Sequence, residues 1–407
     1  MKKILSILLL VISFTINTFS QSWFMQEVSP GAFLQSVKFT SGTNGYCAGP
    51  PAVIYKTTNG GASWFSQNTN HQGYLNDIYF PNQNTGYAVG ELGDVVKTTN
   101  AGQSWTITDV SSTTYFGVTF IDATTGFICG FESILKTSNG GALWYPVSTN
   151  LIGTLHSISF LPGNPSVLYC CGTNGILAKS IDYGETWVQQ SSGSSYNFQS
   201  INVYAPGSVM VVGEGKIMRT VNGGENWLNS PHSPPTYFRC VQMINSTTGF
   251  AAGHSGHILK TYNGGLNWFQ LAYYENFDFS AMHFVDASTG YFTRDDGRVI
   301  KTTNGGGTPI GLIPVSNDIP KAYSLSQNYP NPFNPTTNIK FAIPQTGLVK
   351  LTVFDMLGRE IETLVNENLN AGTYNADWVA ANYPSGVYFY KLTSAGYSVT
   401  KRMVLVK

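Results

Sequence analysis

Charge is scarce in this 407-residue sequence. Lys, Arg, Asp and Glu make up 11% of it, and 22 basic residues balance 22 acidic ones. Soluble proteins average about 25% charged residues, and proteins that bind nucleic acid concentrate basic residues in one patch. The composition therefore argues against nucleic acid as a partner.

Cysteine is also scarce, and the number is odd. In an exported protein an odd count excludes a complete disulfide framework. Cys47, Cys129 and Cys171 occupy equivalent positions in successive repeats, so we expect small buried hydrophobic side chains there. A vicinal Cys170–Cys171 disulfide is the alternative. The five cysteines are Cys47, Cys129, Cys170, Cys171 and Cys240.

Long hydrophobic runs are missing after the first residues. Two lysines precede an apolar run from Ile4 to Ile16, and the small or hydroxylated Thr18 and Ser20 follow. This pattern predicts a secretory signal peptide over residues 1–20, because a membrane-spanning helix needs roughly 20 apolar residues. We expect no transmembrane segment, and a mature chain that is secreted or held at the outer cell surface.

Glycine, with 43 residues, and aromatic residues, at 14%, are abundant instead, a composition typical of short strands and tight turns. A motif Ser/Thr-x-Asn/Asp-x-Gly-x-x-Trp recurs about every 40 residues, the period of a four-stranded propeller blade. We expect the hydroxyl and the Asn/Asp side chain to bond to backbone groups within the turn, and the tryptophan to bury its ring. These structural residues are Asn59, Trp64, Asn100, Trp105, Asn139, Trp144, Asp182, Trp187, Asn222, Trp227, Asn263, Trp268 and Asn304.

The two ends of the repeat array predict how the propeller closes. The last turn, at Thr302 and Asn304, has Pro309 where tryptophan is expected, so the last unit lacks its outer strand. Trp23 belongs to an orphan outer strand with no unit before it. Residues 21–308 therefore predict an all-β fold, a seven-bladed propeller whose N-terminal strand pairs beside residues 298–303.

The turns match the Asp-box of sialidases and sortilin-type receptors, and "SIDYGETW" (180–187) has its strict form. The wider pattern, with Lys-Thr before the turn, more closely resembles the propeller of the Ycf48/Hcf136-like photosystem II assembly factors. The resemblance covers residues 21–308. It implies that the turn residues are structural and lie away from the binding face.

The C-terminal part has a different pattern. Proline-punctuated residues 309–322 predict a linker, and the alternating residues 323–407 predict a small Ig-like β-sandwich. This domain resembles the type A sorting domain of the type IX secretion system of Bacteroidota, which implies that machinery as a partner. The resemblance is carried by "NYPNPFNP", "VFDMLGRE", "AGTYNADW", "PSGVYFYKL" and "KRMVLVK", with Pro384, Gly386, Tyr388, Lys391 and Lys401 as sorting-signal residues.

The sequence does not indicate a catalytic or metal site. Glycosidases need two carboxylates at a set separation, whereas the acidic residues here are scattered over different blades. His254 and His257 lack a nearby third ligand, and we expect no cofactor. We expect no enzyme, with a glycan-active hydrolase as the alternative. The carboxylates available to it are Asp77, Glu91, Asp94, Glu132, Glu214, Asp295 and Asp296.

We predict that the binding site lies on the face of the propeller opposite the tryptophan turns. One aligned position at the start of each innermost strand differs from blade to blade, whereas the apolar position two residues later hardly changes, as expected of binding on a rigid scaffold. We call the residues at that position the mouth residues. They are Gln35, Asn76, Phe116, His156, Gln199, Arg239 and Ser280.

Tyr74, Tyr115 and Phe238 are further candidates on this face, weighed against aromatic side chains that only fill gaps between blades. Aromatic and amide groups suit a glycan or a peptide segment. The sequence thus predicts a non-enzymatic recognition or adhesion module. An assembly scaffold like the Ycf48-type propellers is, besides the hydrolase, the remaining alternative.

Overall fold

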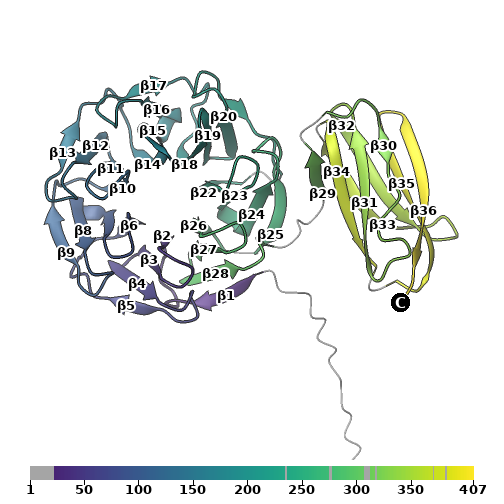
Figure 1. The fold of residues 1–407 in the computed structure, drawn as a ribbon, viewed down its shortest axis with the longest axis horizontal. Coiled ribbons are helices and arrows are strands. Elements are labelled where there is room, and N and C mark those ends of the chain that lie inside the picture. Colours follow the sequence, from purple (N-terminus) through teal and green to yellow (C-terminus); the bar gives the residue numbers. More distant parts are fainter. Residues whose placement is uncertain are drawn as a thin grey trace, which may run out of the picture.

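The computed structural model describes residues 23–407 except 234–235, 275–276, 307–311, 317–318, 370 and 381–382, so the predicted signal peptide lies outside the described residues. Seven four-stranded sheets form a ring around a central axis, and two further sheets form a second domain (Figure 1). The all-β fold with a seven-bladed propeller is therefore confirmed.

Each blade is an antiparallel meander whose first strand lies innermost. Blades one to three are β2 (Ser36–Phe39), β3 (Gly45–Gly49), β4 (Val53–Thr57), β5 (Phe65–Gln67); β6 (Leu75–Tyr79), β7 (Gly86–Gly90), β8 (Asp94–Thr98), β9 (Thr106–Asp109); and β10 (Tyr115–Phe120), β11 (Gly126–Gly130), β12 (Ser133–Thr137), β13 (Tyr145–Val147).

Blades four to six are β14 (Leu155–Leu161), β15 (Asn164–Gly172), β16 (Leu177–Ser180), β17 (Val188–Gln190); β18 (Phe198–Ala205), β19 (Ser208–Gly213), β20 (Lys216–Thr220), β21 (Leu228–Asn229); and β22 (Phe238–Met243), β23 (Gly249–Gly253), β24 (His257–Thr261), β25 (Phe269–Tyr273). Single 3₁₀ turns join the second and third strands of three blades: η1 (Glu91–Gly93), η2 (Thr173–Gly175) and η3 (His254–Gly256).

Blade seven is closed by the start of the chain. Its strands β26 (Phe279–Phe284), β27 (Gly290–Arg294) and β28 (Arg298–Thr302) are completed by β1 (Phe24–Glu27), with Phe24 opposite Lys301. Trp23 is buried, and its ring meets Phe292 edge-on at 5.4 Å. The predicted pairing of the N-terminal strand is confirmed, and β1 covers the edge that β28 would otherwise expose.

The recurring turn is built from its own side chains. In blade one, the Thr57 hydroxyl donates to Asn59 Oδ1 at 2.9 Å and accepts from the Gly61 N–H at 2.9 Å. The Asn59 Oδ1 also accepts from the Ser63 N–H at 2.9 Å. The turn at Thr302 and Asn304, which lacks a tryptophan, keeps the same Thr–Asn and Thr–Gly bonds. These residues act within the turn.

A lysine joins six of the seven turns to the preceding blade. Lys97 Nζ donates to the Gly140 carbonyl at 2.6 Å, and the Tyr87 hydroxyl donates to the same oxygen at 2.8 Å. Lys301 of blade seven reaches Gly60 of blade one at 2.9 Å, so the contacts run around the ring. The other lysine contacts are Lys56 to Ala101, Lys136 to Tyr183, Lys179 to Gly223 and Lys260 to Gly305. In blade five Met210 and Arg219 occupy these two positions.

The C-terminal domain is a sandwich of two sheets. One sheet has the order β29-β34-β31-β30 and the other β33-β32-β35-β36. The segment predicted as a linker is thus corrected in part, because β29 pairs with β34 and belongs to the sandwich. The strands are β29 (Leu312–Ser316), β30 (Ser324–Leu325), β31 (Thr336–Ile343), β32 (Gly347–Phe354), β33 (Glu360–Leu369), β34 (Gly372–Val379), β35 (Gly386–Ser394) and β36 (Tyr397–Leu405).

All five cysteines are buried and carry free thiols, including the adjacent Cys170 and Cys171. Burial raises the pKa of these thiols, as in Cys240, where it reaches about 12. They pack as small hydrophobic side chains, as expected. Among the described residues, no helix is long and apolar enough to span a bilayer.

Blades two and three allow a matched test of the lysine contact. The Gly140 carbonyl has two donors, Lys97 and Tyr87, whereas blade three has Phe127 in place of the tyrosine. Lys136 bonds to the Tyr183 carbonyl at 2.8 Å and also pairs with Glu185, whose side chain is 61% exposed, so that pair adds little to stability. Lys136→Met should therefore cost about 2–3 kcal/mol of unfolding free energy and Lys97→Met about 1 kcal/mol. Urea unfolding measures both. Equal costs would contradict the inference that the Tyr87 hydroxyl still satisfies the Gly140 carbonyl when Lys97 is removed.

Candidate functional site

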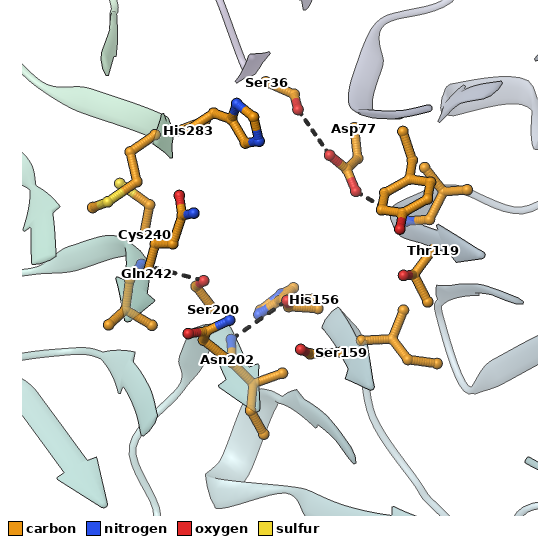
Figure 2. Close-up of a pocket in the computed structure, with 18 of the residues that line it drawn as sticks. Ser36, Asp77, Thr119, His156, Ser159, Ser200, Asn202, Cys240, Gln242 and His283 are labelled. Atoms are coloured by element: carbon orange, nitrogen blue, oxygen red, sulfur yellow. Dashed lines mark hydrogen bonds between the residues drawn. The ribbon is translucent and has the colours of Figure 1, made fainter. Parts of the chain in front are cut away.

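The innermost strands enclose a central cavity of about 600 Å³. This volume lies within the range of about 300–1,000 Å³ typical of ligand sites. All seven mouth residues line the cavity, together with side chains further along the same strands. Figure 2 labels ten of the lining residues, among them Asp77, His156, Asn202 and His283, arranged around the open centre.

The mouth residues are held by contacts that pass from blade to blade. Asn76 Nδ2 donates to the Tyr115 carbonyl at 2.8 Å, and the Phe116 ring meets the His156 ring edge-on at 5.5 Å. His156 Nδ1 bonds to the Phe198 carbonyl at 2.8 Å. Because that carbonyl can only accept, the His156 proton lies on Nδ1. Burial lowers the pKa of His156, so the neutral ring is favoured.

The same series continues through blades five to seven. Gln199 Nε2 donates to the Tyr237 hydroxyl at 2.7 Å. Arg239 Nε donates to His254 Nε2 at 3.0 Å, and His254 Nδ1 lies 3.4 Å from Asp278 Oδ2. Asp278 thus orients the histidine, which in turn orients the guanidinium of Arg239 at the cavity. The mouth combines amides, one aromatic ring, one imidazole and one cation in fixed positions.

Two predicted binding residues are wrong. Tyr115 and Phe238 are fully buried, with 0% exposure, because each begins an innermost strand with its ring packed between blades. Tyr74 is exposed at 49%, and its backbone N–H donates to Glu91 Oε2 at 3.1 Å. The rings of Tyr115 and Phe238 therefore belong to the scaffold. This agrees with the alternative interpretation, in which aromatic side chains only fill gaps between blades.

Deeper in the cavity, side chains satisfy the inner edge of each neighbouring blade. An innermost strand has backbone N–H groups that face the cavity without a strand partner, and these need acceptors. Asn202 Oδ1 accepts from the Met243 N–H at 2.8 Å, and Gln242 Oε1 accepts from the Phe284 N–H at 2.9 Å. Ser159 does the same for Val203 at 3.1 Å. Much of the polar cavity wall therefore holds the ring together.

Asp77 is the carboxylate of this wall, and it too is used structurally. Its oxygens accept from the Ser36 hydroxyl at 2.8 Å, the Ile78 N–H at 2.9 Å and the Val118 N–H at 3.0 Å. Burial raises the pKa of Asp77, although these bonds and the charge of Lys38 oppose the rise. Burial likewise lowers the pKa of Lys38, whose ammonium lies 4.8 Å from the centre of the Tyr79 ring.

His283 closes the wall between blades seven and one. The Phe39 N–H donates to His283 Nδ1 at 3.2 Å, so Nδ1 is unprotonated. Burial, and then the charge of Lys38, hold the pKa of His283 well below its ordinary value.

Sequence reasoning overlooked Lys38 and His283. The signal was available, because the position three residues after each mouth residue also differs from blade to blade. It reads Lys38, Tyr79, Thr119, Ser159, Asn202, Gln242 and His283.

Most of the other carboxylates considered for catalysis already bond to backbone N–H groups, a histidine or arginines outside the cavity wall. Glu91, Glu214 and Asp295 accept backbone N–H groups of Tyr74, Asn197 and Asp278. Asp94 lies 3.2 Å from His71 Nε2, and Asp296 contacts Arg294 and Arg298. Glu132 is exposed. In the described part of the chain, no three His, Cys, Asp or Glu side chains are grouped as metal ligands would be.

Family models match two parts of the chain. Residues 327–407 match the secretion system C-terminal sorting domain, and residues 16–113 match the photosynthesis system II assembly factor YCF48. The two resemblances inferred from the sequence are thereby confirmed, and the sorting-domain match indicates a secreted or cell-surface protein. No curated protein matches the sequence.

Solved structures show the same propeller. "YCF48 bound to D1 peptide" is 18% identical, with a TM-score of 0.60 over 70% of this chain and 95% of that one. YCF48 from Cyanidioschyzon merolae is 15% identical, with a TM-score of 0.59 over 69% and 98%. The WD40 β-propeller domain of Doa1 is 9% identical, with a TM-score of 0.55 over 69% and 97%. At these identities the likeness establishes the fold alone.

The state of His283 gives a pH prediction. Below about pH 6.5 the unfolded chain gains a proton at this residue that the folded chain does not, so stability is lost as the pH falls. The free energy of unfolding falls by up to about 1.4 kcal/mol per pH unit because of this residue. His283→Asn should retain the bond to Phe39, as Asn202 does in blade five, and weaken the loss between pH 6.5 and 5. Urea unfolding across that range checks it, and parallel curves for both proteins would refute it.

Proposed function

We propose that the protein is a secreted or surface-displayed recognition or adhesion module without enzymatic activity. Its propeller binds a peptide or glycan segment at the mouth of the central cavity, and residues 323–407 direct its export through the type IX system. The observation that carries this proposal is the set of seven mouth residues. They occupy one equivalent position on a repeated scaffold, line one cavity and differ in chemistry.

The arrangement of the mouth suits an extended polar ligand. Amides bond to peptide groups and sugar hydroxyls, and an aromatic ring gives an apolar surface for stacking. Arg239 is oriented through His254, so little side-chain freedom is lost when it binds. One related propeller, YCF48, has been solved with a D1 peptide. A peptide is therefore the first ligand class to test.

The hydrolase alternative has less support. A glycosidase needs two carboxylates facing the same bond. Asp77 is the single carboxylate among the described residues that line the cavity, and it already accepts three hydrogen bonds. The scaffold alternative is favoured by the fold likeness to YCF48, and the same mouth would then bind a partner protein.

A binding screen tests the proposal. The full mature chain is applied to peptide and glycan arrays, and each ligand found is then titrated against Gln199→Ala/Arg239→Ala. Because these two side chains line the mouth, the double variant should weaken binding about tenfold or more.

Tyr183→Ala is the matched control, since Tyr183 is 53% exposed on the opposite face, in a tryptophan turn. It should bind like the unaltered chain. Binding that is insensitive to the mouth variant would place the ligand elsewhere, and cleavage of any array glycan would show that the protein is an enzyme.

A further inference from the structure

The sandwich topology gathers distant segments at one end of the domain. β32 ends where β35 begins, with Phe354 opposite Phe389, and the first residue of β35, Gly386, lies opposite Leu405 of β36. The Phe333 N–H donates to the Val404 carbonyl at 3.0 Å. We call this end, made of residues 329–333, 355–359, 384–386 and 404–407, the motif end. Four of the five segments that carried the sorting-domain resemblance contribute to it.

The turn between β32 and β33 projects from this end in a fixed shape. The Gly358 N–H donates to the Asp355 carbonyl at 3.0 Å, and the Asp355 N–H donates to the Arg359 carbonyl at 3.0 Å. Asp355 Oδ1 accepts from the N–H groups of Leu357 and Arg359. Gly358 has a φ of +75°, which a residue with a side chain rarely adopts. Met356 and Leu357 occupy the two central positions of this tight turn.

Those central positions face water and usually carry polar residues or glycine. Here Met356 is 71% exposed and Leu357 is 78% exposed. Tyr329 and Val406, at the same end, are 82% and 50% exposed. The turns at the opposite end instead contain Pro-Gln-Thr (344–346) and Ala-Gly (395–396). The exposed apolar side chains are therefore concentrated where the motifs converge.

We propose that Met356 and Leu357 form the apolar anchor by which the sorting domain docks on a protein of the export machinery. Exposed apolar clusters on rigid supports mark protein interaction sites. Arg359, 73% exposed beside the pair, is already paired with Asp355, with Arg359 Nε 2.6 Å from Asp355 Oδ2, so the turn presents the apolar pair without a net charge to an apolar cleft of the partner. This inference rests on the proposed export role of residues 323–407, and it names the surface that performs it.

The test measures export of the full chain in a bacterium with an active type IX system. Immunoblots compare the amount in the medium and on the surface with the amount retained in the periplasm. Met356→Ser/Leu357→Ser should reduce the exported fraction about tenfold or more, since two central anchor residues are lost. Leu348→Ser, 59% exposed at the opposite end of β32, should be exported within about twofold of the unaltered chain.

Deletion of residues 323–407 separates this inference from the proposed function. If the deleted chain is still exported, the export role itself fails. If deletion stops export and the double variant leaves normally, the anchor is wrong. Resistance of the periplasmic chain to trypsin shows that a variant has folded. If trypsin degrades the double variant, the single variant Leu357→Gln takes its place in the export test. If Leu348→Ser lost as much export as Met356→Ser/Leu357→Ser, the proposed anchor would also be wrong.

Discussion

In six of the seven recurring turns, a single carbonyl oxygen fixes one blade to the next. A lysine from the preceding blade donates to that oxygen, and in blades one, two, four and seven a tyrosine hydroxyl donates to it as well. Bonds from a charged donor are about twice as strong as neutral ones. The contact also lies over an aromatic ring, as where Lys97 lies 5.5 Å from the centre of Tyr87. The turn motif must repeat closely because each copy serves its neighbour.

This constraint gives the two faces of the propeller different sequence requirements. The turn face is occupied by contacts that hold the ring together, so its residues are repeated. The mouth face also has contacts between blades, but a different type of side chain makes each of them, as Asn76 and His156 do, so its residues can differ without loss of closure. The cavity wall lies between these extremes, since Asp77, Asn202 and Gln242 vary in type and yet perform the same task for the neighbouring strand.

The fold could be predicted because its signals are local and repeated. The period of about 40 residues set the blades, and the missing tryptophan near Pro309 placed β1 in blade seven. The site was predicted less well. Tyr115 and Phe238 are adjacent in sequence to mouth residues, but alternation along a strand turns them into the core. The aligned repeats could have placed Lys38 and His283 at the cavity, but their roles depend on contacts between blades one, two and seven, which no local pattern reveals. The prolines of residues 309–322 predict a linker, and β29 is not recognisable there because its partner β34 lies far along the chain.

The pairing of β1 with β28 also affects the order in which the molecule can be completed. β1 is synthesised first, but its partner appears only after six other blades have been made. Until then the circle stays open, and its leading strand remains close to the predicted export leader. A chain that must cross a membrane before it folds benefits from such a delay, because a closed ring would no longer thread through a narrow translocation channel.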